Sequence, residues 1–142
     1  MPPFSPQLHR RTPAPAPIIL GLGADLCEVA RLERELARDH SDVLAAAFGQ
    51  AEHERCRRHR HPARAYAACF AAKESVIKAL APAGGQGTFW QDIEIGESGG
   101  GGPVVTLQGR LAELARDAGI RRVVLSSAHC RRYATACAVA TG

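Results

Sequence analysis

Aromatic side chains are scarce in this sequence, which has one tryptophan, two tyrosines and four phenylalanines among 142 residues. None of them lies between Arg55 and Arg64, where basic residues are densest. Modules that bind single-stranded nucleic acid stack bases on aromatic side chains interleaved with basic ones. We therefore expect no nucleic acid as a partner. The alternative is a basic nucleic-acid-binding module, which salt-sensitive binding to any DNA would support.

Long apolar runs and paired-cysteine motifs are absent as well. No stretch approaches the length of a membrane-spanning helix, and the N-terminus lacks the apolar segment of a secretory signal. The five cysteines are odd in number and show no CxxC spacing. This pattern is typical of reduced thiols rather than of a disulfide framework. We expect a cytoplasmic protein that does not associate with a membrane.

The length of the chain suits one domain with a substantial core. Residues 1–17 carry six of the nine prolines, so we predict a disordered tail there and a single domain over residues 18–142. The net charge of +4 and the pI of about 9.0 indicate an acidic partner or a phosphate-rich ligand.

Residues 70–80 form the stretch around which the rest of the chain is arranged. Residues three, four and seven apart share a helix face, which gives one apolar stripe made of Tyr66, Phe70, Ile77 and Leu80. Glu74 falls on the edge of this stripe, where a carboxylate is costly unless a cation or a metal compensates it. The alternative is an ordinary pair between Glu74 and Lys78 on a solvated face. Lys73 and Lys78 are the only lysines in the sequence, which favours a specific role for this stretch.

The apolar periodicity and the positions of glycine and proline predict alternating helices and strands. Helices are expected at residues 28–37, 42–47, from about 50, at 62–80 and at 110–118. Strands are expected at residues 18–23, 89–95, 103–107, 121–127 and 133–140. The elements alternate irregularly and the hairpins are antiparallel. We therefore predict an α+β fold in which an antiparallel sheet packs against the long central helix.

Two local patterns have a structural as well as a functional interpretation. Asp25-x-x-Glu28 has the form of a helix-capping arrangement, so Asp25 is either a cap or a functional carboxylate. The preceding glycines lack the spacing of a dinucleotide-binding fingerprint. The histidines of residues 53–61 match no standard zinc spacing, and the arginines among them would repel a dication. A basic surface that docks an acidic partner is the favoured interpretation of residues 53–61.

Three separated pieces of the chain line up with one family. They are Gly21-Leu-Gly-Ala-Asp25 with Glu28 and Arg31, Phe70-Ala-Ala-Lys-Glu74 with Lys78, and Trp90 to Ile95 followed by Leu125 to His129. In this order and spacing they resemble the short holo-(acyl-carrier-protein) synthase type of 4′-phosphopantetheinyl transferase. The resemblance covers about residues 18–140.

The resemblance implies transfer of the phosphopantetheine arm of coenzyme A to a serine of an acyl carrier protein, with release of adenosine 3′,5′-bisphosphate. It also implies Mg²⁺ and a homotrimer with active sites at the subunit interfaces. A carrier-protein binder that kept the fold without the activity is the rival interpretation. The retained Asp25 and Glu74 argue against that rival, because a carboxylate on an apolar stripe is costly to keep.

The resemblance also implies roles for particular residues. Asp25 and Glu74 would hold Mg²⁺, which prefers carboxylate and phosphate oxygens. Lys78 would hold the pyrophosphate of coenzyme A, and His129 would lie near that substrate. The attacking serine would lose its proton to a metal-bound water or to one of the two carboxylates. Arg31 suits the acidic surface of a carrier protein.

Two positions depart from the family pattern. Cys69 stands where the family usually has a basic residue that reaches the 3′-phosphate of coenzyme A, and Ala128 replaces a serine or threonine before the histidine. One expectation is that this phosphate contact is missing, so that Cys69→Arg would strengthen binding of coenzyme A. The alternative is that another arginine has taken over the contact, for example Arg64, Arg131 or Arg132.

Overall fold

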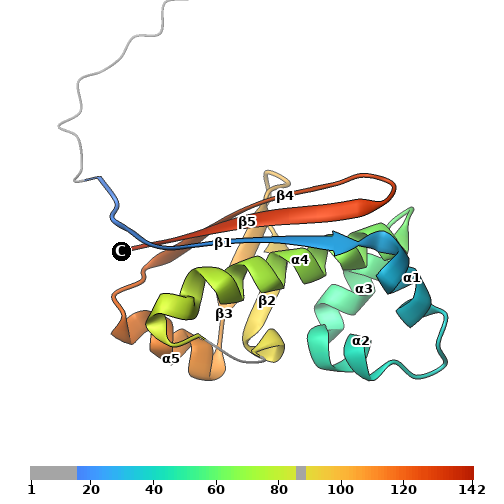
Figure 1. The fold of residues 1–142 in the computed structure, drawn as a ribbon, viewed down its shortest axis with the longest axis horizontal. Helices are drawn as coiled ribbons and strands as arrows, with labels where there is room; N and C mark the ends of the chain where they lie inside the picture. The colour runs from blue at the N-terminus through green and yellow to red at the C-terminus, as the bar shows by residue number, and fades with distance from the viewer. Residues whose placement is uncertain (1–15, 86–88) are drawn as a thin grey trace, which may run out of the picture.

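A single long helix runs through the protein, and one antiparallel sheet covers one side of it (Figure 1). The computed structural model describes residues 16–85 and 89–142. The helix is α4 (Pro62–Leu80), and the sheet has the order β1 (Ile19–Glu28), β5 (Tyr133–Thr141), β4 (Arg122–His129). Both strand pairs are antiparallel. The predicted α+β class and the bounds of the central helix are confirmed.

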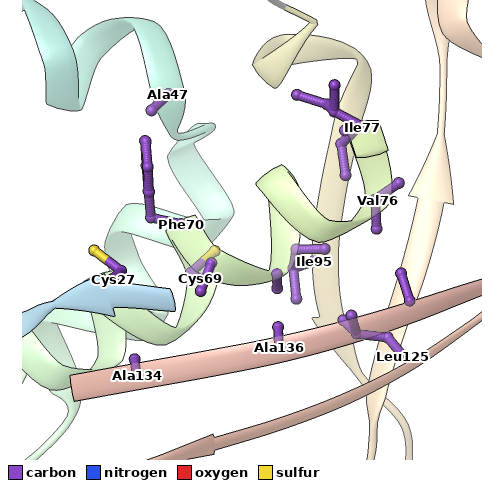
Figure 2. Packing of buried hydrophobic residues seen from close by; sticks show 14 of the residues in the cluster. Cys27, Ala47, Cys69, Phe70, Val76, Ile77, Ile95, Leu125, Ala134 and Ala136 are labelled. Atoms are coloured by element: carbon purple, nitrogen blue, oxygen red, sulfur yellow. The ribbon is translucent and has the colours of Figure 1, made fainter. Parts of the chain in front are cut away.

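Small residues let β1 and β5 approach α4 closely. A Cβ atom on Gly21 would lie 1.8 Å from the Ala79 carbonyl oxygen, and one on Gly23 would lie 2.0 Å from the Ser75 carbonyl oxygen. The strand β5 faces the helix with alternate buried alanines at positions 134, 136, 138 and 140. Figure 2 shows Ala134 and Ala136 pointing from β5 toward α4. The two glycines before Asp25 therefore serve close packing, which brings that carboxylate next to α4.

Three helices precede α4. α1 (Val29–Leu36) and α3 (Gln50–Arg58) pack against α4, and α2 (Asp42–Ala47) packs against α1. Ser41 caps α2, because its Oγ accepts a hydrogen bond from the Leu44 amide at 3.2 Å. Gly49 separates α2 from α3, as the sequence predicts. All three helices lie within two residues of their predicted positions.

The β2–β3 hairpin and the last helix complete the core. The hairpin pairs β2 (Ile93–Glu97) with β3 (Pro103–Leu107), and α5 (Gly109–Asp117) follows it. Short 3₁₀ turns occupy η1 (Ala81–Ala83) and η2 (Trp90–Asp92). The predicted strand at residues 89–95 is therefore wrong in its first half. Asp92 explains the turn, because its backbone carbonyl and its carboxylate accept hydrogen bonds from the amides of Gln108 and Leu111.

Two strands are longer than predicted. β1 continues to Glu28 because its residues pair with β5 as far as Tyr133. β4 continues to His129, which pairs with Ala134, so the turn before β5 is only Cys130 to Arg132. Asp25 consequently lies inside a strand, and the N-cap position of α1 is Glu28, which makes no side-chain capping bond. The capping interpretation of Asp25 is wrong.

The outer face of the sheet carries exposed apolar side chains. Leu22 and Leu26 on β1 and Val124 on β4 alternate with residues that point toward α4. None of the helices in Figure 1 lies over this face.

Helices of the described ranges lack the combination of length and apolar character that a bilayer crossing requires. Most of the predicted tail, residues 1–15, lies outside the described residues; Ala16 to Ile18 are exposed and form no helix or strand.

Candidate active site

The strand β1 and the helix α4 bring Asp25 and Glu74 to one shallow pocket of about 250 Å³. Arg31 from α1, Phe70 from α4 and Trp90 from η2 line the same pocket. The two residues predicted as metal ligands, 49 positions apart in the sequence, therefore share a site. Arg31, predicted at the carrier-protein surface, stands at its rim with its guanidinium 5.0 Å from the centre of the Phe70 ring.

Each carboxylate of this pocket has one hydrogen-bonded oxygen. The Lys78 ammonium lies 2.5 Å from Asp25 Oδ1 and also donates to the Ala24 carbonyl oxygen at 3.1 Å. The Trp90 indole Nε1–H donates to Glu74 Oε1 at 2.7 Å. Lys78 thus pairs with Asp25 rather than with Glu74, and the alternative of an ordinary Glu74–Lys78 pair is wrong.

The donor set of the pocket fits Mg²⁺. Two carboxylates offer hard oxygen ligands, and Mg²⁺ usually takes one or two carboxylates together with substrate phosphates and water. Cys27 also lines the pocket, but burial raises the pKa of its thiol to about 11, so it is neutral at pH 7 and no thiolate competes. With two carboxylates, the pocket needs oxygen ligands from the substrate or water as well, because the described ranges contain no group of three or more acidic, histidine or cysteine side chains that could hold a metal.

A second pocket, of about 210 Å³, contains His129 and Cys69 together with Arg55 of α3. His129 is exposed at the end of β4, where its ring can meet a ligand. Cys69 is buried, and Arg55 Nη2 lies 3.9 Å from its Sγ atom. A hydrogen bond shared with Cys56, together with burial, raises the pKa of the Cys69 thiol well above its ordinary value, so Cys69 stays neutral. Arg55 therefore supplies the positive charge beside this thiol.

Arg64, predicted to bind coenzyme A, lies in a neighbouring basic pocket of about 540 Å³. This pocket is lined by Arg60, His61, Arg131 and Arg132 as well. The two basic pockets are adjacent, because the rings of His59 and His61 are 6.5 Å apart and His59 stands 5.9 Å from His129. Arg64 lowers the pKa of His61, which favours the neutral ring there.

One buried ion pair that supports the site has no signal in the local sequence pattern. Lys73 Nζ lies 2.6 Å from Glu52 Oε2 and donates to the carbonyl oxygens of Ala47 at 2.6 Å and Trp90 at 2.9 Å. Lys73 is fully buried, unlike Lys78 on the same helix. Its partners come from α2, α3 and η2, which are remote in the chain, so no local pattern could reveal them.

Comparison with known proteins points to one family. The family model of the 4′-phosphopantetheinyl transferase superfamily matches residues 21–138. The holo-[acyl-carrier-protein] synthase of Desulforudis audaxviator is 44% identical over 125 residues, which is 88% of this chain and 95% of that relative. The crystal structure of the holo-ACP-synthase from Plasmodium yoelii superposes with a TM-score of 0.75 at 26% identity, covering 89% of this chain and 98% of that one. The Helicobacter pylori holo-[acyl-carrier-protein] synthase in complex with coenzyme A gives a TM-score of 0.71 at 27% identity, covering 84% and 98%.

Proposed function

This chain belongs to the 4′-phosphopantetheinyl transferase superfamily, and we propose that it performs the transfer at the pocket that contains Asp25 and Glu74. The reaction moves the 4′-phosphopantetheine arm of coenzyme A onto a serine of an apo acyl carrier protein and releases adenosine 3′,5′-bisphosphate. The meeting of two carboxylates and a lysine from β1 and α4 is the observation that carries this proposal.

Asp25 and Glu74 hold Mg²⁺ in this proposal, each through an oxygen that the contacts described above leave available. When bound, the ion neutralises negative charge on the phosphate oxygens of the substrate. Lys78 is half-exposed on a flexible side chain, so its ammonium can leave Asp25 and hold a pyrophosphate oxygen. Phosphoryl transfer depends mostly on such positioning and charge neutralisation.

The pocket of Arg55 and His129 binds the 3′-phosphate end of coenzyme A. Arg55 supplies a guanidinium, which is suited to bidentate recognition of phosphate, and His129 is exposed beside it. Cys69 precedes Glu74 by five residues, which places the two about 140° apart around α4. The metal pocket and the Arg55 pocket of one chain therefore face different sides of α4. One molecule of coenzyme A reaches a metal pocket and an Arg55 pocket more readily when the two belong to adjacent subunits.

The outer face of the sheet supports a homotrimer as the active assembly. Leu22 is 65% and Leu26 is 64% exposed in the single chain, and Val124 adds an apolar side chain from β4. An exposed apolar sheet face of this kind favours burial against a second copy of the chain. We place the subunit interface on this face, close to Asp25, which lies between Leu22 and Leu26 on the same strand.

The decisive experiment is mass spectrometry of an apo acyl carrier protein incubated with this protein, coenzyme A and Mg²⁺. We expect a mass increase of one phosphopantetheine group, and no increase with the matched Glu74→Gln variant. Light scattering of the same samples gives the number of subunits. An unmodified carrier protein with the wild-type enzyme would contradict the transfer, and a monomer at assay concentration would contradict the shared site.

A further inference from the structure

Trp90 forms a hydrogen bond with one of the two carboxylate oxygens of Glu74. Its indole Nε1–H donates to Oε1 at 2.7 Å, and within the described ranges no hydrogen bond reaches Oε2. A hydrogen bond to one oxygen of a carboxylate is charge-assisted, and it restricts rotation of the carboxylate group. Glu74 therefore presents a single oriented oxygen to the pocket.

Two contacts hold Trp90 in place, one at its backbone carbonyl and one at its indole ring. The Trp90 carbonyl oxygen accepts a hydrogen bond from Lys73 Nζ at 2.9 Å, and Lys73 is fully buried in its pair with Glu52. The indole ring packs against Phe70 with ring centroids 5.6 Å apart. Lys78, the partner of Asp25, is by contrast half-exposed and on a flexible stem. Of the two carboxylates, Glu74 is the one whose partner cannot easily move away.

We propose that Trp90 is a positioning residue that restricts Glu74 to one-oxygen ligation and thereby makes the pocket selective for Mg²⁺ over Ca²⁺. Mg²⁺ is small and demands near-ideal octahedral geometry, whereas Ca²⁺ accepts carboxylates through both oxygens in flexible geometries. An oxygen engaged by the indole is less available for two-oxygen binding. This inference rests on the proposed metal site at Asp25 and Glu74.

The test uses the fact that Trp90 is the only tryptophan in the chain. Biosynthetic replacement of tryptophan by β-(3-benzothienyl)alanine exchanges the indole N–H for sulfur at this one position while keeping the ring shape. The matched control carries 5-fluorotryptophan, which keeps the N–H. Isothermal titration calorimetry of each protein with Mg²⁺ and with Ca²⁺, in the presence of coenzyme A and without carrier protein, gives the two dissociation constants after subtraction of a coenzyme A blank.

We expect the ratio of the Ca²⁺ to the Mg²⁺ dissociation constant to fall about tenfold in the sulfur analogue and to stay at the wild-type value in the fluorinated control. Trp90→Phe, with its fold checked by circular dichroism, should show the same loss of selectivity. An unchanged ratio in both donor-free proteins overturns the role of Trp90 and leaves the metal site standing. Equal Mg²⁺ binding by wild type and Glu74→Gln instead overturns the metal site itself, and the inference falls with it.

Discussion

Two lysines on α4 each pair with a carboxylate, and the surroundings of the two pairs differ. Lys73 and Glu52 have side chains that are each 1% exposed, whereas Lys78 is 50% and Asp25 16% exposed. The buried pair joins α3 to α4, and the exposed pair joins β1 to α4. Both contacts are close, at 2.6 Å and 2.5 Å.

The hydrogen-bonding capacity of each pair explains its role. Glu52 receives the amides of Gly49 and Ile95 as well as the Lys73 ammonium, so both of its oxygens are used. Glu52 therefore has no unbonded oxygen for a ligand. Its bonds hold α3, α4 and β2 together. Asp25 and Glu74 stand at a pocket, and within residues 16–85 and 89–142 each keeps an oxygen without such a bond. A free oxygen at a pocket therefore distinguishes the two carboxylates that we propose as metal ligands from Glu52, whose oxygens are both bonded.

The largest expected effect is on catalysis at the two carboxylates of the metal pocket. Asp25→Ala or Glu74→Ala should lower turnover at least about a thousandfold, because each removes a metal ligand whose charge stabilisation contributes several kcal/mol. The free energy of unfolding should change by about 1 kcal/mol or less, because the exposed Lys78–Asp25 pair contributes little and Glu74 loses a single part-buried hydrogen bond from Trp90. Turnover at saturating Mg²⁺ and urea unfolding measure the two quantities. Near-normal turnover in either variant would show that the metal assignment is wrong.

The buried pair should respond in the opposite way. Lys73→Met leaves Glu52 charged and unpaired in the core, which should lower the free energy of unfolding by about 3–5 kcal/mol. The matched control is Lys78→Met, the same substitution five residues further along α4, which should cost less than about 1 kcal/mol and still impair transfer. Urea unfolding at one protomer concentration compares the variants. Similar losses of stability in both would remove the distinction between the two pairs.

The parts of the fold set by local chemistry were predictable from the sequence. Pro62 at the first turn and the apolar stripe of α4 define that helix, and Ser41 defines the start of α2. Asp25 and Glu74 were found from their motifs, and the pocket that unites them depends on the small residues of β1.

The remaining features depend on residues far apart in the chain. The extension of β1 to Glu28 follows from pairing with β5, more than a hundred residues later. The turn at Trp90 replaces a predicted strand because Asp92 bonds to the start of α5 and Lys73 holds the Trp90 carbonyl oxygen. Arg55 meets Cys69 only because α3 packs on α4. None of these contacts has a local sequence signal.

A smaller effect is expected at the second pocket. Arg55→Gln should raise the KM for coenzyme A about ten- to a hundredfold, because it removes a charge-assisted contact to the 3′-phosphate. The KM for dephospho-coenzyme A, which lacks this phosphate, should stay nearly unchanged. Kinetics with both substrates make the comparison.

The same assay decides the role of Cys69. Its thiol is buried 3.9 Å from Arg55 Nη2, so Cys69→Arg would press a second cation against the first. This variant should therefore lose stability rather than bind coenzyme A more tightly. A lower KM for coenzyme A in a stable Cys69→Arg protein would instead support the original expectation that the phosphate contact is missing.

The smallest effect concerns Arg31 at the rim of the metal pocket. Its guanidinium is exposed over the Phe70 ring, where it can meet an acidic carrier protein without entering the pocket. Arg31→Glu should raise the KM for carrier protein about fivefold, since one exposed ion pair contributes up to about 1 kcal/mol. The KM for coenzyme A should change much less. Arg116→Glu makes the same change of charge on α5, at the other end of the molecule from α1, and should change neither constant (Figure 1).

Added salt should weaken carrier-protein binding to the wild type more than to Arg31→Glu, because screening acts on exposed charges beyond about 8 Å at physiological ionic strength. Equal effects of Arg31→Glu on both KM values would place this arginine at the nucleotide instead of at the carrier protein.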